Sequence, residues 1–147
     1  MYQKSFIAGA ADFDFDERFR GASCIDRAKD VRLMFFADYG FPLDIFRKQR
    51  LTPLLLKERL DYIRDIGLLE EVKVSLALAG LAPDGTRYTL RCEFVRLDGK
   101  VAARVSSTGG WLDGNLQKLT NPPPQLIAAL QDLPMTADYQ PLLSALK

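Results

Sequence analysis

The chain has 147 residues, 48% apolar and 27% charged, which is the size and balance of one globular domain that can bury a core without disulfides or a metal. Its 20 basic and 19 acidic residues leave a net charge of +1, which argues against binding driven by a basic surface, as in most nucleic-acid-binding proteins. The chain contains no histidine, which excludes Ser-His-Asp and Cys-His nucleophile systems and nearly all catalytic zinc sites.

The cysteines and the apolar segments indicate the compartment of the protein. Cys24 and Cys92 are too few for a disulfide framework or a metal-ligand cluster, and we expect both to be small buried thiols. The N-terminal segment MYQKSFIAGAADF lacks the long apolar core of a signal peptide, and no apolar run approaches the ~20 residues of a membrane helix. The sequence therefore predicts a cytoplasmic protein.

The first part of the chain predicts a strand, a charged loop and a buried helix. Residues 2–13 show the loose alternation of a strand, and the charged stretch DFDFDERFRGASC (12–24) follows. From about Ala22 to Tyr39 apolar residues recur at helical spacing, and the second half of this segment is apolar nearly all round. Such a helix needs cover on several sides, and Gly40 is placed to end it.

Residues 43–66 predict a connector followed by a second strand. Segment 43–52 contains the basic run FRKQR and is interpreted as a loop. Within 51–66 a strand is expected to start near Leu54, with one side formed by Leu56, Glu58, Leu60, Tyr62 and Arg64.

Residues 70–112 carry the most regular pattern of the sequence. Three runs alternate apolar and polar residues, and the turn sequences PDG (83–85) and DG (98–99) separate them. This pattern predicts a three-stranded antiparallel meander, with Cys92 on an apolar strand face.

The C-terminal part predicts a short helix within NPPPQLIAALQDL (121–133), entered through prolines that suit a first helical turn, and an irregular cap over 134–147. Residues 1–147 are thus expected to form one α+β domain, in which a long central helix is wrapped by a curved antiparallel sheet. One flank of such a helix stays open, so we expect a second copy to cover it.

This order of elements resembles the hotdog-fold acyl-CoA thioesterases of the 4-hydroxybenzoyl-CoA thioesterase-like group. The segments that carry the resemblance are DVRLMFFADYGFP (30–42), LKERLDYIRDIGLLEEV (56–72) and STGGWLD (107–113). The resemblance extends over roughly residues 2–140. It implies a hotdog fold and an enzyme that hydrolyses an acyl-CoA thioester.

The family's catalytic loop reads Asp-x-Asp-x-x-Gly-His-x-x-Asn and leads into the central helix. Counting back from the DVR segment places Asp12 and Asp14 on the two aspartates of this motif. The rest departs from it, because Glu17 replaces the glycine, Arg18 the histidine and Gly21 the asparagine.

The resemblance implies roles for the charged loop. Asp14 is the expected nucleophile or general base, and main-chain N–H groups within 18–22 are the expected donors to the oxyanion. Asp16, Glu17 and Arg18 complete the candidate site, where they would tune the loop. A one-residue slip would exchange Asp14 and Asp16. The alternative interpretation is a solvated loop, since acidic residues are favoured near a helix N-terminus in any case.

Other residues have a structural interpretation beside a functional one. Asp26 on the central helix is a reserve carboxylate, while Asp30 and Arg32 suggest an ion pair within the helix or to the sheet. Trp111 is expected to pack at a strand end or to line an acyl tunnel. The basic run within 47–50 is either a solvated connector or a binding site for the phosphates of coenzyme A.

The resemblance also sets expectations for cofactors and partners. No metal or organic cofactor is expected, since coenzyme A enters as part of the substrate. We expect a homodimer or homotetramer that binds neither nucleic acid nor membranes. A non-hydrolytic acyl-thioester binding or regulatory protein on the same fold remains the second hypothesis, because the Gly-His-Asn part of the motif is altered. A hotdog dehydratase is disfavoured, because those enzymes depend on a histidine.

Overall fold

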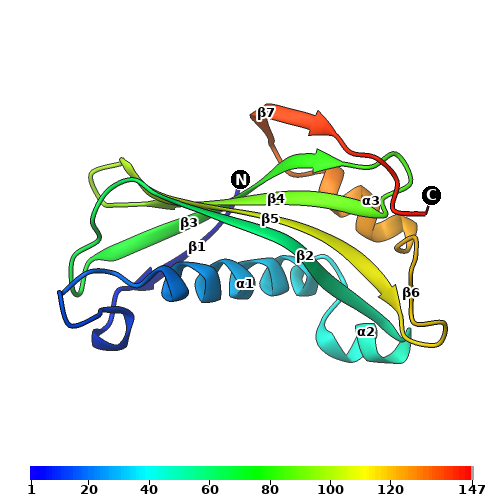
Figure 1. The fold of residues 1–147 in the computed structure, drawn as a ribbon, viewed down its shortest axis with the longest axis horizontal. Coiled ribbons are helices and arrows are strands. Elements are labelled where there is room, and N and C mark those ends of the chain that lie inside the picture. Colours follow the sequence, from blue (N-terminus) through cyan, green and yellow to red (C-terminus); the bar gives the residue numbers. More distant parts are fainter. Residues whose placement is uncertain (147) are drawn as a thin grey trace.

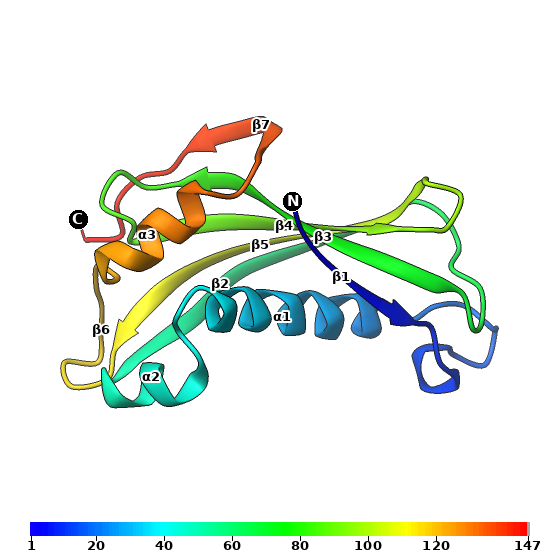
Figure 2. The same ribbon diagram turned by 180° about the vertical axis from the view of Figure 1, so that it is seen from behind.

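The computed structural model describes residues 1–146 and places one long helix, α1 (Gly21–Asp38), along the inner face of a curved sheet (Figure 1; Figure 2). The long strands are β1 (Tyr2–Ile7), β2 (Leu51–Tyr62), β3 (Glu71–Leu81), β4 (Arg87–Val95) and β5 (Val101–Asp113). The shorter elements are α2 (Leu43–Lys48), β6 (Lys118–Leu119), α3 (Pro124–Gln131) and β7 (Met135–Pro141). The α+β architecture predicted from the sequence, with a wrapped central helix and a short C-terminal helix, is confirmed.

The sheet follows the order β1-β3-β4-β5-β2, and every neighbouring pair on this path is antiparallel. The predicted meander is confirmed as β3, β4 and β5. Gly85 and Gly99 have φ of +74° and +81°, so both DG turns use the left-handed backbone that glycine adopts readily. Within the described residues, β2 is the end strand of this path, and one of its edges carries no partner.

The first strand is shorter than predicted. β1 ends at Ile7, and residues Ala10–Asp12 form a single 3-10 turn. The Asp12 carboxylate accepts a hydrogen bond from the Gly9 N–H at 2.9 Å, which holds the chain in this turn. The extended prediction over 2–13 is therefore wrong from Ala8 onward.

Residues 43–48 form helix α2 instead of the predicted connector. Pro42 is its N-cap, and Phe46 is buried with its ring 5.6 Å from Phe41 and 6.2 Å from Trp111. A helix of six residues is too short to show a helical period, so packing of Phe46 defines it.

Strand β2 begins at Leu51 rather than near Leu54, and its pairing with β5 shifts between Leu55 and Lys57. Leu56 lies in this bulge and is 45% exposed, so the prediction that it shares a face with Glu58 is wrong. The tail prediction is also wrong over β7, which pairs in parallel with β3.

The core lies between α1 and the inner face of the sheet. Its largest part is an aromatic cluster in which Trp111 is fully buried, with ring centroids of Phe36 and Tyr88 at 5.5 and 5.1 Å. The indole N–H of Trp111 donates to the carbonyl oxygen of Gly85 at 3.0 Å. Trp111 thus packs inside the strand end, as predicted.

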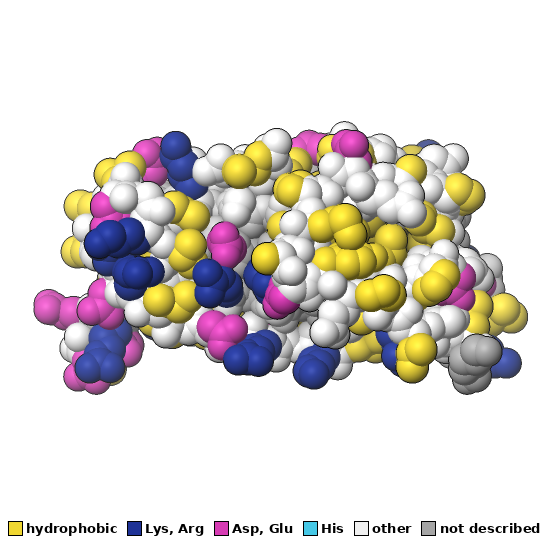
Figure 3. Space-filling view, turned by 90° about the horizontal axis from the view of Figure 1, so that it is seen from above, with side chains coloured by type: hydrophobic (Ala, Val, Ile, Leu, Met, Phe, Trp, Pro, Cys, Tyr) yellow, Lys and Arg dark blue, Asp and Glu magenta, His cyan; other side chains and the backbone are white. Residues whose placement is uncertain are grey.

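On the outer face of the sheet, interspersed basic and acidic side chains gather over one half, and hydrophobic side chains gather over the other (Figure 3). Two of its ion pairs are Arg104 with Glu93 at 2.7 Å and Arg91 with Asp138 at 2.8 Å. The sheet therefore packs one apolar face on α1 and carries these ion pairs on the opposite face. None of the helices in residues 1–146 is long and apolar enough to span a membrane.

Candidate active site

Residues 14–18 form a tight turn that the Asp14 carboxylate holds together. Its Oδ1 accepts hydrogen bonds from the backbone N–H groups of Asp16 at 2.9 Å and Arg18 at 3.0 Å. The Asp14 N–H donates in turn to the carbonyl oxygen of Arg18 at 3.0 Å. Within residues 1–146 the Oδ2 atom has no hydrogen-bond partner, and the side chain is exposed. One oxygen of Asp14 stabilises the turn, while the other is accessible.

The turn brings Asp16, Glu17 and Arg18 together with Asp14 on an exposed loop. In the described part of the chain, their side chains form no ion pair within 4.0 Å. Glu17 has a φ of 60°, in the left-handed region that favours glycine. Glu17, which stands where the family loop has glycine, thus adopts a backbone conformation that favours glycine.

Asp12, the first aspartate of the motif, is buried beneath the loop. Burial opposes its ionisation, but the Gly9 N–H, Ser23 and the guanidinium of Arg27 outweigh this effect and lower its pKa. Arg27 Nη2 lies 3.3 Å from Asp12 Oδ2. Asp12 thus anchors the chain between β1 and α1 as a buried anion.

The start of α1 offers two free donors beside this loop. The carbonyl oxygen of Arg20 accepts the N–H groups of Ser23 at 3.0 Å and Cys24 at 3.3 Å. The preceding N–H groups, of Gly21 and Ala22, have no acceptor in the described structure. Together with the positive end of the helix dipole, these two groups favour a negatively charged oxygen.

The sequence also singled out Cys24 and Asp26, both on α1. Burial, with the negative charge of Asp12 as a second cause, raises the pKa of the Cys24 thiol to about 12. This agrees with the expectation of a buried thiol. Asp26 lies on an exposed part of the helix.

Tyr62, at the end of β2, lies close to the charged loop. Burial raises its pKa to about 12, and the charges of Cys24, Asp65 and Asp14 add to this effect while Arg18 opposes it. The loop and the C-terminal end of β2 therefore occupy the same end of the molecule (Figure 1).

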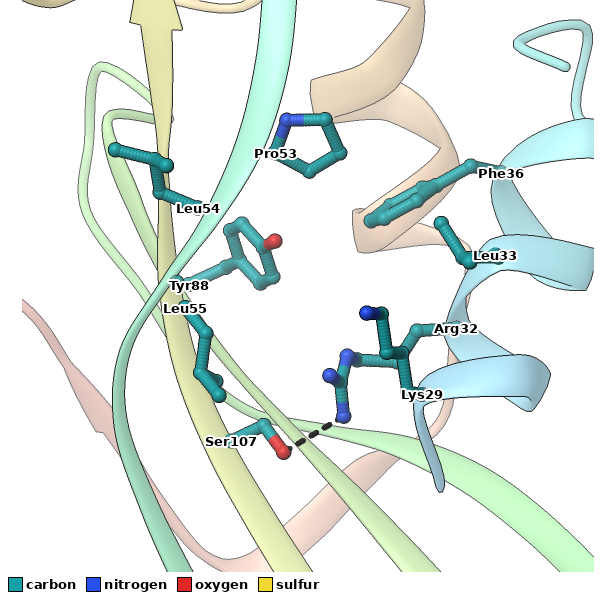
Figure 4. A pocket seen from close by; sticks show the side chains of 10 residues that line it. Lys29, Arg32, Leu33, Phe36, Pro53, Leu54, Leu55, Tyr88 and Ser107 are labelled. Carbon is teal, nitrogen blue, oxygen red and sulfur yellow. Dashed lines mark hydrogen bonds between the residues drawn. The ribbon is translucent and has the colours of Figure 1, made fainter. Parts of the chain in front are cut away.

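A pocket of about 210 Å³ lies between the second half of α1 and the strands (Figure 4). Its apolar walls come from α1, β2 and β4, and they consist of Leu33, Phe36, Pro53, Leu54, Leu55 and Tyr88. Its polar lining consists of Lys29, Arg32 and Ser107. The pocket thus combines a mostly apolar cavity with a cationic side.

Arg32 crosses from α1 to the sheet and joins a buried polar group. Its Nη1 donates to Ser107 Oγ at 2.8 Å and lies 3.5 Å from Glu58 Oε2, and the Ser107 hydroxyl donates to the same Glu58 oxygen at 2.8 Å. The side chains of Arg32 and Glu58 are only 11% and 13% exposed. Of the two ion pairs foreseen for Arg32, the helix-to-sheet pair is present, while Asp30 is exposed.

Tyr88 forms the inner wall of the pocket. The residue is 3% exposed, and its hydroxyl points into the space between the strands and α1 (Figure 4). No residue among 1–146 forms a hydrogen bond with this hydroxyl. Burial raises the pKa of Tyr88 to about 12, and Arg32 opposes this effect. The phenol therefore stays protonated at neutral pH and faces a cavity.

The pocket and the charged loop are separate in one chain. Arg32 follows Gly21 by eleven residues, which is about 17 Å along a helix. Tyr88, Ser107 and Glu58 were not predicted as functional residues from the sequence, because they lie on three different strands that meet only in the folded sheet. A polar side chain at an inward position, such as Ser107, was the signal that could have marked them.

The basic run after α1 borders the same region. Arg47 and Arg50 line a shallow groove with Phe46 and Pro53, and Pro53 also lines the pocket. Arg47, Lys48 and Arg50 are exposed. In residues 1–146 no three His, Cys, Asp or Glu side chains cluster so that they could hold a metal ion.

Several solved structures share this fold. A hypothetical protein of Staphylococcus aureus, solved in complex with CoA, superposes with a TM-score of 0.83 at 16% identity over 92% of this chain and 87% of its own. The 1,4-dihydroxy-2-naphthoyl-CoA thioesterase from Synechocystis gives 0.79 at 13% identity, covering 90% and 96%. The DHNA-CoA thioesterase from Staphylococcus aureus gives 0.77 at 17% identity, covering 88% and 87%. At these identities the likeness shows the hotdog fold.

A sequence comparison with curated proteins finds no match. The sequence does match the family model of the thioesterase-like superfamily over residues 10–130, which include the charged loop, α1 and the whole meander. The chain therefore belongs to the thioesterase-like superfamily.

Proposed function

We propose that the protein hydrolyses an acyl-CoA thioester to the free acid and CoA, without a metal or organic cofactor. The observation that carries the proposal is a pair of N–H groups, of Gly21 and Ala22, that have no acceptor within residues 1–146. They belong to a chain of this superfamily, and the loop before them presents the Asp14 carboxylate. Such donors at a helix N-terminus stabilise the oxyanion that forms when a thioester carbonyl is attacked.

In the proposed reaction, Asp14 Oδ2 takes a proton from water while the water oxygen bonds to the thioester carbonyl carbon. The carbonyl oxygen becomes an oxyanion near the N–H groups of Gly21 and Ala22. When the C–S bond breaks, the proton passes to the CoA thiolate, so that a free acid and a free thiol leave. Arg18 would offset the negative charge that Glu17 adds to the loop.

We infer that the working unit is a homodimer paired through β2. In the described part of the chain, this strand of twelve residues has one edge without a partner, and its exposed apolar side chains include Leu55, Leu56 and Tyr62. Unpaired apolar edges of this kind are ready templates for another strand. An isologous dimer would pair the two copies of β2 antiparallel about a two-fold axis.

This pairing would complete the site. The charged loop lies at the C-terminal end of β2, beside Tyr62, whereas the pocket is lined by Pro53, Leu54 and Leu55 near the N-terminal end. Antiparallel pairing places the C-terminal end of one β2 beside the N-terminal part of the other. The loop of one subunit would then serve the pocket of its partner, with the basic run beside that pocket available for the CoA phosphates.

The second candidate is a protein that binds acyl thioesters without cleaving them. The observation in its favour is that Asp14 Oδ1 is already engaged by two backbone N–H groups, which gives this carboxylate a structural task. Glu17 and Arg18 also replace the glycine and the histidine of the family loop.

Thiol release from a panel of acyl-CoAs, short, long and aromatic, separates the two candidates. The comparison uses wild type, Asp14→Asn and, as a matched control, Asp16→Asn. The amide oxygen that Asp14→Asn introduces can still accept both turn hydrogen bonds, so the loss of the carboxylate is isolated. Burial raises the pKa of Cys24 and Cys92 to about 12, so the folded protein itself should react little with the thiol reagent.

We expect Asp14→Asn to lose about a hundredfold or more in turnover, as for a principal catalytic group. Full activity in Asp14→Asn with loss in Asp16→Asn would transfer the role to Asp16. A wild type that binds acyl-CoA but releases no thiol from any substrate would establish the second candidate.

A further inference from the structure

The pocket between α1 and the strands contains more hydrogen-bond donors than its own residues use. Lys29 has no acceptor within residues 1–146, and Arg32 donates one N–H, to Ser107. An ammonium and a guanidinium only donate hydrogen bonds. Any polar group that enters beside them must therefore accept.

The Ser107 hydroxyl on this side of the pocket already has both a donor and an acceptor. Glu58 Oε2 accepts the Ser107 proton and lies against Arg32, while Ser107 Oγ accepts from Arg32. Because Glu58 balances Arg32, the charge that remains on this side is that of Lys29. The polar side of the pocket is thus cationic and rich in donors.

The Tyr88 hydroxyl extends this donor set to the inner wall. It is attached to an almost fully buried residue, points into the cavity and has no partner among residues 1–146. Because this hydroxyl is reached from the cavity, water can hydrogen-bond to it there, and a ligand that displaces this water must supply an acceptor or leave the hydroxyl desolvated. A purely apolar ligand would leave this hydroxyl unpaired.

The volume limits what the pocket can hold. A cavity of about 150 Å³ in another protein binds benzene, so about 210 Å³ accommodates an acyl group somewhat larger than one ring. The side chains of Leu33, Phe36 and Leu54 line the pocket and would contact the apolar part of such an acyl group.

We propose that this pocket is the acyl-specificity site, and that Tyr88 makes it select a short or single-ring acyl group with a hydrogen-bond-accepting oxygen at the end away from the thioester. This inference rests on the proposed thioester function. It adds to it the class of acyl group and the residue that recognises it. Selectivity arises because a site with buried polar groups rejects a ligand that leaves them unpaired.

Binding of non-hydrolysable analogues tests the inference apart from turnover. Three CoA thioethers that mimic the glutaryl, 5-oxohexanoyl and 5-methylhexanoyl thioesters have acyl portions of the same shape and the same number of non-hydrogen atoms. They differ in whether the far end is a carboxylate, a ketone or a hydrocarbon branch. Dissociation constants are measured by calorimetry for wild type, Tyr88→Phe and Tyr39→Phe, the last being a control that removes a tyrosine hydroxyl on the surface.

We expect wild type and Tyr39→Phe to bind at least one oxygen-bearing analogue about tenfold more tightly than the hydrocarbon analogue, and Tyr88→Phe to lose this preference. Preference for both oxygen-bearing analogues supports recognition by the hydroxyl of any acceptor. Preference for the carboxylate alone, reduced in Lys29→Gln, supports recognition of an anion by the donor set. Equal binding of all three by wild type, no binding of any, or a preference that Tyr88→Phe retains would overturn the inference.

Turnover of the parent thioesters then distinguishes this inference from the proposed function. Selective binding without thiol release leaves the specificity site in place and removes the hydrolase. Thiol release without any preference among the three acyl groups supports the hydrolase and removes the specificity site.

Discussion

The Tyr88 hydroxyl occupies space that exists because residue 109 is glycine. A Cβ atom on Gly109 would lie 2.5 Å from Tyr88 Oη and 2.8 Å from the carbonyl oxygen of Leu54. Both contacts are far shorter than van der Waals distance, and the second involves backbone that cannot turn aside. Gly109 therefore shapes the inner wall of the pocket without contributing a side chain.

Gly109→Ala should consequently destabilise the fold and close the pocket. We expect a loss of about 1–3 kcal/mol in the free energy of unfolding, as for overpacking of a filled interior. Urea denaturation measures it. Gly67→Ala is the matched control, since a Cβ there would meet only the side-chain oxygen of Glu70 at 3.5 Å. Equal stability of the two variants would show that a Cβ atom at residue 109 is accommodated without strain.

The Arg32–Glu58 pair should be costly to break from one side. Because both side chains are nearly buried, Glu58→Ala leaves the guanidinium without its counter-charge, and we expect a loss of about 3 kcal/mol. Replacing both residues, as Arg32→Met with Glu58→Leu, should cost less than the sum of the single changes. Asp61→Ala, which breaks the exposed pair with Arg59, should cost at most about 1 kcal/mol in the same denaturation experiment. Additive effects at positions 32 and 58 would refute this coupling.

The sequence predicted those parts of the fold whose signals are local. Alternation and two DG turns were sufficient for the β3–β5 meander, and an apolar helix ending at Gly40 was sufficient for α1. Helix α2 and strand β7 were not predicted. Helix α2 is too short to show a helical repeat of apolar residues. Strand β7, MTADYQP, owes its conformation to pairing with β3 rather than to any alternation.

The candidate site divides in the same way. The charged loop was visible as a contiguous stretch, and the resemblance singled out Asp14 within it. The pocket was not visible, since Arg32 and Ser107 are 75 positions apart and meet only through the packing of α1 on the sheet. Inward strand positions such as Tyr88 look like core in a sequence, and the cavity in front of the hydroxyl is a property of the tertiary structure.

Asp12 should make the folded state sensitive to acid. Its pKa is lower in the folded protein than the ordinary 3.8, so its contribution to stability is complete above that value and is lost as the pH falls through the lower, folded pKa. The free energy of unfolding of wild type should therefore fall more steeply below about pH 4 than that of Asp12→Asn.

Denaturant titrations between about pH 2.5 and 6 compare these slopes. Arg27→Met removes one of the causes that favour the Asp12 anion and should give an intermediate slope. Parallel curves for wild type and Asp12→Asn would show that other groups dominate acid unfolding.

A positive charge on the open edge of β2 should both separate the subunits of the proposed dimer and abolish its activity. Lysine on an edge strand opposes pairing with another strand, and Leu56 lies exposed in the bulge of β2. We expect Leu56→Lys to have the mass of a monomer by light scattering and to lose at least about tenfold in thiol release, because the loop and the pocket would come from different subunits. Leu97→Lys is the matched control, since Leu97 is also an exposed leucine, 68% exposed against 45% for Leu56, but lies in the turn between β4 and β5, away from that edge. A monomeric Leu56→Lys variant with full activity would mean that one chain contains a complete site, and a dimer that persists in this variant would place the interface on another surface.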